Sequence, residues 1–418
     1  MFFSPTSIGQ LPAMRRILVA SLLLIVFSPF LSQTVRAQSA VGVADLAVAY
    51  QFGQQFSVQA RLSAVAPITD LSILYRAQGE PSTRSDHVSI DPDGHINYIN
   101  TFSQGPLRPF ARVDFWFHVT LQTGEQLDTS PFYFYYNDDR FPWQMQQDGN
   151  IRVHWYAGDQ AFAREALDAA RSGLQSTGTM LSITLTQPVD IYIYAIAADL
   201  QTALAIDGET WSNGHASPDL GVALVSISPG LDQSVEIERQ IPHELAHVLT
   251  YEVTGSRSRY KTLPIWLTEG IASMAETPNP DYPRSISQAT EKQALIPLAD
   301  LCLSFPPDMS RVTLAYAESE SFVRFIVNQY GNSGLQKLIH AYMDGLDCQQ
   351  GTLQALGSPL ATLETDWWRS AGVNNDAAVL AGLFPYIGVL TIVLFVPLVL
   401  VALFWRKPYG DDGQLTRK

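Results

Sequence analysis

The chain has 418 residues, of which 46% are hydrophobic and 16% are charged, and its formal net charge at pH 7 is −14. This length allows two or three domains. No basic patch with interleaved aromatic side chains occurs, which argues against nucleic-acid binding, and the acidic balance favours solubility without naming a partner.

The N-terminus resembles a secretory signal. Arg15 and Arg16 precede the apolar stretch 17–31, and the small side chain of Ala37 suits a cleavage point. We therefore expect a signal peptide over residues 1–37, with an uncleaved membrane anchor as the alternative. Both alternatives predict that the rest of the chain is exported.

Residues 41–137 have the pattern of β-strands. Apolar side chains alternate with polar ones in several short runs, most clearly at Val113, Phe115, Phe117, Val119 and Leu121. No group of side chains here has metal-ligand or catalytic spacing. We expect an all-β sandwich of immunoglobulin-like size with a spacer or binding role.

The character of the sequence changes after residues 137–142. From 145 to 227 strand patterns alternate with helical ones, Asp159 can cap the first helix, and the rest of the region to 370 is helical. A later helix is expected over residues 235–253, ended by Gly255. Pro242 inside it predicts either a kink or a helix that starts late, and the sequence does not distinguish the two.

The central motif is His243-Glu244-Leu245-Ala246-His247. Residues four apart lie on one face of a helix, so the two imidazoles can bind the same metal ion. Glu244 is then placed to take a proton from a water molecule on that metal. Catalytic zinc takes three protein ligands, and the best third candidate is Glu269, in an apolar helical stretch after Pro264. Glu276 is expected to be a surface charge, with support of a ligand as the alternative.

Together, the HELAH stretch and the stretch Trp266-Leu267-Thr268-Glu269-Gly270 resemble the gluzincin metallopeptidases, most closely the bacterial peptidase-MA-like group. The resemblance covers roughly residues 145–370. It implies a zincin-like catalytic domain in which His243, His247 and Glu269 bind Zn²⁺ and Glu244 is the catalytic base. Some relatives have an acid four residues after the third ligand to orient a ligand histidine, and this chain has Ser273 there.

The resemblance also implies a donor for the oxyanion of the reaction. Gluzincins often use a Tyr or His from a later helix, so Tyr316 is the first candidate and His340 the second. The run 221–227 resembles the edge strand that pairs with an extended substrate. His215, just before it, is expected to be a loop histidine.

Two features near the C-terminus complete the prediction. Cys302 and Cys348 are expected to form a disulfide in an exported chain, with free thiols as the alternative. Residues 384–405 form a charge-free apolar run long enough to span a bilayer, and the positive charges in the tail 406–418 mark the cytoplasmic side.

The expected fold class is thus an α+β zincin-like catalytic domain (145–370), preceded by an all-β Ig-like sandwich (41–137) and followed by a C-terminal transmembrane helix (384–405). The expected function is hydrolysis of peptide or protein substrates by a zinc metallopeptidase, anchored in the cell membrane by one span, with the catalytic domain outside the cytoplasm. The alternative is an exported zinc-binding module of peptidase-like fold without activity, acting in binding or surface anchoring.

Overall fold

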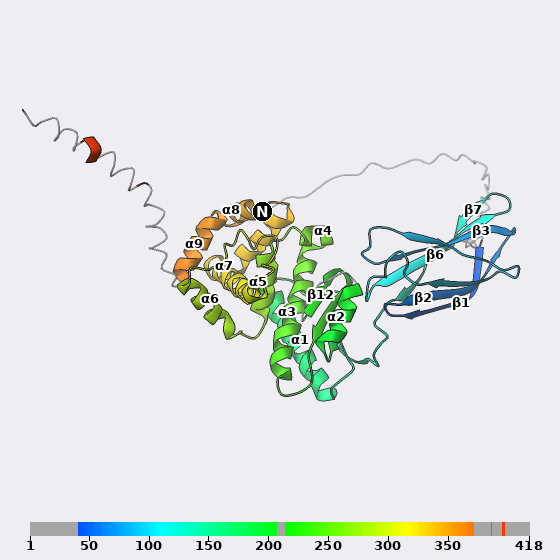
Figure 1. Ribbon diagram of the computed structural model, residues 1–418, viewed down its shortest axis with the longest axis horizontal. Helices are drawn as coiled ribbons and strands as arrows, with labels where there is room; N and C mark the ends of the chain where they lie inside the picture. Colours follow the sequence, from blue (N-terminus) through cyan, green and yellow to red (C-terminus); the bar gives the residue numbers. More distant parts are fainter. Residues whose placement is uncertain (1–40, 207–213, 372–385, 387–394, 398–418) are drawn as a thin grey trace, which may run out of the picture. The chain divides into compact units, whose positions relative to one another are not determined.

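The computed structural model describes residues 41–206, 214–371, 386 and 395–397. The first part of this chain forms two antiparallel sheets, one with the order β1-β2-β5 and one with the order β4-β3-β6-β7, in which β8 also pairs with β6 (Figure 1). The strands are β1 (Val41–Gln51), β2 (Gln55–Ala64), β3 (Ile68–Ala77), β4 (Arg84–His87), β5 (His95–Asn100), β6 (Arg112–Leu121), β7 (Gln126–Asp128) and β8 (Phe132–Tyr135).

Alternation along the strands gives these sheets their shared core. Along β6 every second residue is buried, from Val113 to Leu121, because successive side chains point to opposite faces. Phe56 on β2 packs against Tyr75 on β3, with ring centroids 5.2 Å apart, so the inner faces of the two sheets meet.

A third sheet, of five strands in the order β12-β13-β11-β10-β9, carries the helices of the second half. Strands β10, β11 and β13 run parallel, while β9 and β12 are antiparallel to their neighbours at the two edges. The strands are β9 (Gln144–Asp148), β10 (Ile151–Trp155), β11 (Val189–Tyr194), β12 (Gly214–Ser217) and β13 (Val222–Ser226).

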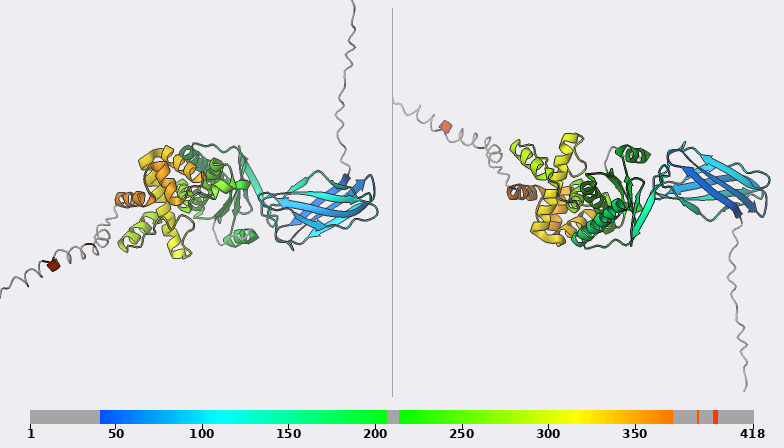
Figure 2. Two further views of the ribbon diagram at one scale, coloured as in Figure 1. Left: turned by 90° about the horizontal axis from the view of Figure 1, so that it is seen from above. Right: turned by 90° about the horizontal axis from the view of Figure 1, so that it is seen from below.

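Helices cover this sheet because its central strands are apolar on both faces. Ile191 and Ile193 of β11 pack with α1 (Gln160–Leu181) and α3 (Gln233–Thr254), whereas Tyr192 and Tyr194 belong to the core that includes α2 (Ala197–Ile206). In both Figure 1 and Figure 2, α1 and α3 lie together along one face of the sheet. The remaining elements are η1 (Pro218–Leu220), α4 (Arg257–Tyr260), α5 (Ile265–Ala275), α6 (Asp281–Glu291), α7 (Met309–Met343), α8 (Cys348–Leu356) and α9 (Leu360–Ser370).

The predicted fold class is wrong in two respects. The region after residue 144 is mixed α/β rather than α+β, because α1 connects β10 to the parallel strand β11, and parallel neighbours need such a crossover. The sequence shows which segments are strands but not in which direction they pair. The domain boundaries at 41–137 and 145–370 stay a prediction.

The second correction concerns the transmembrane helix of the predicted fold class. Among the described residues, no helix has the length and apolarity needed to cross a membrane. Most of the predicted span, 384–405, lies outside those residues, as do the predicted signal peptide, 1–37, and the tail, 406–418. The prediction of a span used the hydropathy of an apolar run, and hydropathy alone does not establish a helix.

Two predicted local features have clear outcomes. The disulfide between Cys302 and Cys348 is confirmed, and it ties the segment before α7 to the start of α8. The late helix start at Pro242 is wrong, because α3 begins at Gln233 and continues through the proline to Thr254. Within α7, Gly331 has a φ of 69° and interrupts the helical backbone.

A buried carboxylate holds the segment between α6 and α7. The two oxygens of Glu318 accept hydrogen bonds from the Ile296 N–H at 3.0 and 3.2 Å, and Glu364 accepts one from the Leu298 N–H at 2.7 Å. The Glu318 side chain has no solvent exposure. Burial raises the pKa of Glu318 to about 8.

This raised pKa predicts that stability falls as pH rises. Between pH 4.5 and about 8 the unfolded chain has released the Glu318 proton while the folded chain keeps it. The folded state then binds more protons, so the free energy of unfolding decreases across this window. Calorimetry should record a falling Tm from pH 5 to pH 8 and a flatter profile for Glu318→Gln. An equally steep profile in this variant would contradict the assignment to Glu318.

Candidate metal centre

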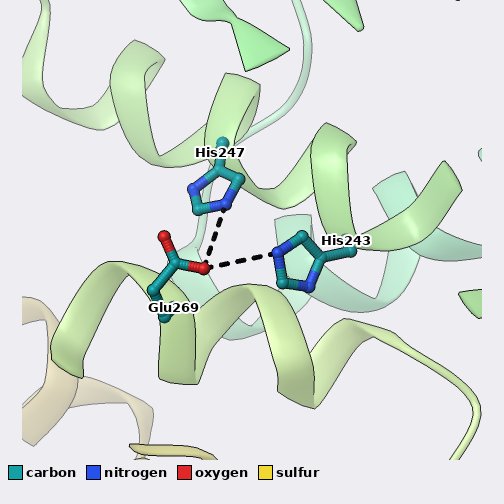
Figure 3. Close-up of side chains that lie close together, drawn as sticks. All are labelled: His243, His247 and Glu269. Carbon is teal, nitrogen blue, oxygen red and sulfur yellow. Dashed lines mark ion pairs between the residues drawn. The ribbon is translucent and has the colours of Figure 1, made fainter. Parts of the chain in front are cut away.

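Three side chains from two helices meet at one point. His243 and His247 lie one turn apart on α3, and Glu269 faces them from α5 (Figure 3). Glu269 Oε2 is 3.4 Å from His243 Nε2 and 3.6 Å from His247 Nε2. Their candidate ligand atoms all lie within 4.8 Å of one another, in the one metal-ligand cluster found among the described residues.

These separations fit a shared metal ion. Zinc–ligand bonds of about 2.0–2.1 Å at tetrahedral angles place two ligand atoms roughly 3.4 Å apart. Ordinary N–H···O hydrogen bonds are shorter, about 2.7–3.2 Å between heavy atoms. The observed distances of 3.4 and 3.6 Å therefore suit three atoms around a cation better than direct hydrogen bonds. Two nitrogens and one carboxylate oxygen are also a donor set that zinc accepts.

Close packing of α5 brings Glu269 to this point. The first turn of α5 is fixed by Ile265 N–H, which donates to Cys302 O at 3.0 Å. Gly270, next to Glu269, lets α5 approach α7, since a Cβ at this position would lie 2.4 Å from Ser319 O. A larger residue at 270 would push α5, and Glu269 with it, away from α7.

Each imidazole is oriented through its other nitrogen. His243 Nδ1 lies 2.7 Å from Glu276 Oε1, and His247 Nδ1 lies 3.1 Å from the Tyr260 hydroxyl. An imidazole that binds a metal through Nε2 carries its proton on Nδ1 and donates it to such an oxygen. Such contacts hold the ring and its tautomer in the state that binds a metal.

The structure corrects the expectation that Glu276 is a surface charge. Only 5% of its side chain is exposed, and its carboxylate contacts His243. Glu276 therefore supplies the orienting acid that some relatives carry where this chain has Ser273. Tyr260 was missed, because it lies on the short helix α4 and no motif marks it. Tyr260 is 13 residues from His247, a separation that does not place two residues on one face of a helix or a strand.

The pKa values of Glu269 and Glu244 are shifted in opposite directions. Burial raises the pKa of Glu269, but the charges of His247 and His243 outweigh it and hold the pKa well below its usual value. Burial raises the pKa of Glu244 above its ordinary value. Glu269 thus stays ionised as a ligand should, and Glu244 is the better proton acceptor near neutral pH.

Glu244 lies against the start of the edge strand β12. The residue is 7% exposed, and a Cβ at Gly214 would come within 2.3 Å of its Oε1 atom. The predicted edge strand 221–227 is wrong, because β13 lies between β12 and β11, and among the described strands β12 is the one at this edge of the sheet. His215, expected in a loop, lies on β12, with Nε2 3.4 Å from Ser217 Oγ.

Tyr316 is brought to the centre, whereas His340 is exposed near the end of α7. The Tyr316 ring meets the His243 ring edge-on, with centroids 5.9 Å apart, and also packs on Phe305. Burial, followed by the charges of Glu269 and Glu244, raises the pKa of Tyr316, so its hydroxyl keeps its proton. Its role as oxyanion donor stays a prediction.

Several solved structures are similar to parts of this chain. A carbohydrate-binding module family 56 β-1,3-glucan binding domain shares 13% identity, with 22% of this chain and 98% of that chain covered and a TM-score of 0.16. Purple acid phosphatase PPD1 from yellow lupin (Lupinus luteus) seeds shares 8%, with 46% and 36% covered and a TM-score of 0.21. A GH family 64 laminaripentaose-producing β-1,3-glucanase from Paenibacillus barengoltzii shares 15%, with 28% of each chain covered and a TM-score of 0.16. At such TM-scores these similarities carry no functional argument.

No curated protein matches this chain. A family model does match, and it covers the part of the chain that contains the three clustered side chains. Residues 169–373 match the model described as the peptidase MA superfamily, which supports a gluzincin-like peptidase family for this region and suggests peptidase activity on a peptide substrate.

Proposed function

We propose that the chain is a zinc-dependent metallopeptidase of the gluzincin type. The observation that carries this is the position of Glu269 Oε2, 3.4 and 3.6 Å from the two histidine Nε2 atoms, with Glu244 beside them on α3. A structural zinc site would fill the fourth position with another Cys or His. Among the residues that the structure describes, the cluster has three members, and three protein ligands leave a position for water and substrate.

The residues of the chain then have separate tasks. Zinc, when bound, supplies a Lewis acid that polarises the scissile carbonyl and acidifies water. His243, His247 and Glu269 would hold the ion. Glu244 takes the proton of the attacking water and passes it to the nitrogen of the leaving amine. The protonated Tyr316 hydroxyl donates a hydrogen bond to the oxyanion that forms at the carbonyl.

The edge strand β12 supports an extended peptide as substrate. In the order β12-β13-β11-β10-β9 of the strands that the structure describes, β12 stands at one end, and Gly214 at its start touches Glu244. A peptide added alongside β12 would form main-chain hydrogen bonds and bring its own backbone to the catalytic base.

We also propose that this catalytic region functions outside the cytoplasm. The Cys302–Cys348 disulfide supports this, because disulfides persist in oxidising compartments and are rare in the cytosol.

The function is tested with the purified full-length chain. We expect about one zinc ion per chain, cleavage of an unbiased peptide mixture, and loss of cleavage after removal of the metal by a chelator, with recovery on adding zinc. Bound zinc without cleavage would instead support a zinc-binding module without activity. A chain that binds no zinc would reject the proposal.

Replacement of Glu276 should weaken zinc binding without removing a ligand. Glu276→Ala leaves the Nδ1 proton of His243 without an acceptor, so we expect an affinity loss of about 10- to 100-fold. Glu276→Gln keeps an acceptor oxygen and should lose less. Competition with a chromogenic chelator measures both, and Glu291→Ala on the exposed face of α6 is the control. Unchanged affinity in Glu276→Ala would show that this carboxylate does not support the ligand.

A further inference from the structure

A proline lies inside the helix that carries both histidines. Pro242 precedes His243 directly, and α3 extends nine residues before it and twelve after it. Proline has no N–H and its ring crowds the carbonyl four residues earlier, so at an interior position it costs about 3 kcal/mol or more. We therefore asked which contacts near His243 depend on the proline and offset this cost.

The carbonyl that Pro242 leaves free has another partner. In a regular helix the N–H of residue 242 would bond to Glu238 O. Here Thr277 N–H donates to Glu238 O at 3.2 Å, and the Thr277 hydroxyl donates to Glu238 Oε2 at 3.0 Å. The chain leaving α5 is therefore attached to α3 at the carbonyl released by the proline.

This attachment is one residue away from the acid that orients His243. Glu276 ends α5 with an extended backbone, φ −68° and ψ 159°, and its Oε1 accepts the Nδ1 proton of His243 at 2.7 Å. Thr277 follows it and bonds to α3 about one turn before His243. Two neighbouring residues thus contact the same helix on either side of Pro242, one through the backbone and one through a side chain.

The proline ring is also closely packed. A Cβ at Gly173 on α1 would lie 2.8 Å from Pro242 Cβ and 2.9 Å from its Cα. The glycine gives α1 room to lie directly against the proline, and Pro242 is buried there. The ring therefore cannot shift without moving α1 against α3.

We propose that Pro242 is a positioning residue for the metal centre: it exposes the Glu238 carbonyl that binds Thr277 N–H, and this bond holds Glu276 against His243. The inference rests on the proposed function, because the benefit of an oriented His243 is realised when the imidazole binds zinc.

Alanine at 242 separates positioning from stability. Pro242→Ala supplies an N–H that competes with Thr277 for Glu238 O and removes the helical defect. The metal-free variant should therefore be at least as stable as the wild type, while its zinc affinity falls by about 10-fold, the lower end of the effect of losing a support contact. A purely structural proline would show the opposite pattern, with lower stability and unchanged affinity.

A double-mutant cycle tests the route through Glu276. Zinc dissociation constants are measured by chelator competition for the wild type, Pro242→Ala, Glu276→Ala and the double variant, with Glu276→Gln as a milder second partner. If Pro242 acts through Glu276, the double variant binds zinc as weakly as Glu276→Ala alone. Pro283→Ala is the matched control, because Pro283 lies in the first turn of α6, where its missing N–H frees no helical carbonyl. Its zinc affinity should equal that of the wild type.

The outcomes separate this inference from the proposed function. Additive losses in the double variant, or wild-type affinity in Pro242→Ala, would overturn the role of Pro242 while zinc binding itself stands. A wild-type chain that binds no zinc would overturn both.

Discussion

Replacement of Glu244 by glutamine is expected to lower kcat by about 10²- to 10⁴-fold, the usual contribution of a general acid–base group, with zinc content unchanged. Glutamine has nearly the same shape, so it fits the buried space against Gly214, but it cannot accept the proton of the attacking water. The measurement is steady-state cleavage of a peptide found in the mixture experiment, alongside metal analysis of the same sample.

Glu252→Gln is the matched control for this variant. Glu252 lies on the same helix, and its carboxylate hydrogen-bonds to Thr186 at 2.9 Å on the exposed side. It should keep the wild-type rate. Equal cleavage by the wild type and by Glu244→Gln would exclude Glu244 as the base, and equal background rates in both would exclude the peptidase function.

Replacement of Glu269 by alanine is expected to abolish stable zinc binding, with an affinity loss larger than the roughly 10- to 100-fold found for support residues. The change leaves two imidazole ligands and removes the only carboxylate of the three-residue cluster. Glu269→Gln should also bind poorly, because it lacks the charge that neutralises the ion. Zinc stoichiometry after dialysis measures the effect.

Far-UV circular dichroism of the Glu269 variants checks that α3 and α5 still form. Full zinc retention in a folded Glu269→Ala would identify a different third ligand. Glu318→Gln serves as a comparison, since Glu318 is also buried on a helix yet lies outside the cluster. It should keep one zinc ion per chain.

Local spacing made part of the site predictable. Two histidines four apart must share a helical face, so the sequence alone placed His243 and His247 together. Glu269 follows in a second apolar helix, and such a helix is expected to bury its apolar side chains against the first. The structure brings these three side chains together, and their role as metal ligands remains for experiment.

The supporting contacts were not predictable, because they depend on tertiary placement. Tyr260 reaches His247 from a four-residue helix, and Glu276 reaches His243 only because the chain turns extended after α5. From the sequence, Pro242 predicted only a kink or a late helix start. The carbonyl that it frees belongs to Glu238, and Thr277, which binds that carbonyl, is 39 residues from Glu238, so no periodicity connects the two.

For the fold as well, features set by local spacing were predictable and features set by tertiary placement were not. Apolar alternation located most strands, since it depends on side chains two residues apart. Whether β10 and β11 pair in parallel or antiparallel depends on the path of the connection through α1. The apolar alternation along the two strands is the same in either case. The edge position of β12 was missed because its four residues, Gly214–Ser217, carry no apolar alternation.

The most direct test of the central claim is a crystal structure of the zinc-loaded chain with anomalous diffraction recorded at the zinc edge. The account predicts one strong peak about 2.0–2.1 Å from His243 Nε2, His247 Nε2 and a Glu269 oxygen, with Glu276 and Tyr260 still on the two Nδ1 atoms. A peak at another place, or a Glu269 side chain turned away from the ion, would contradict it.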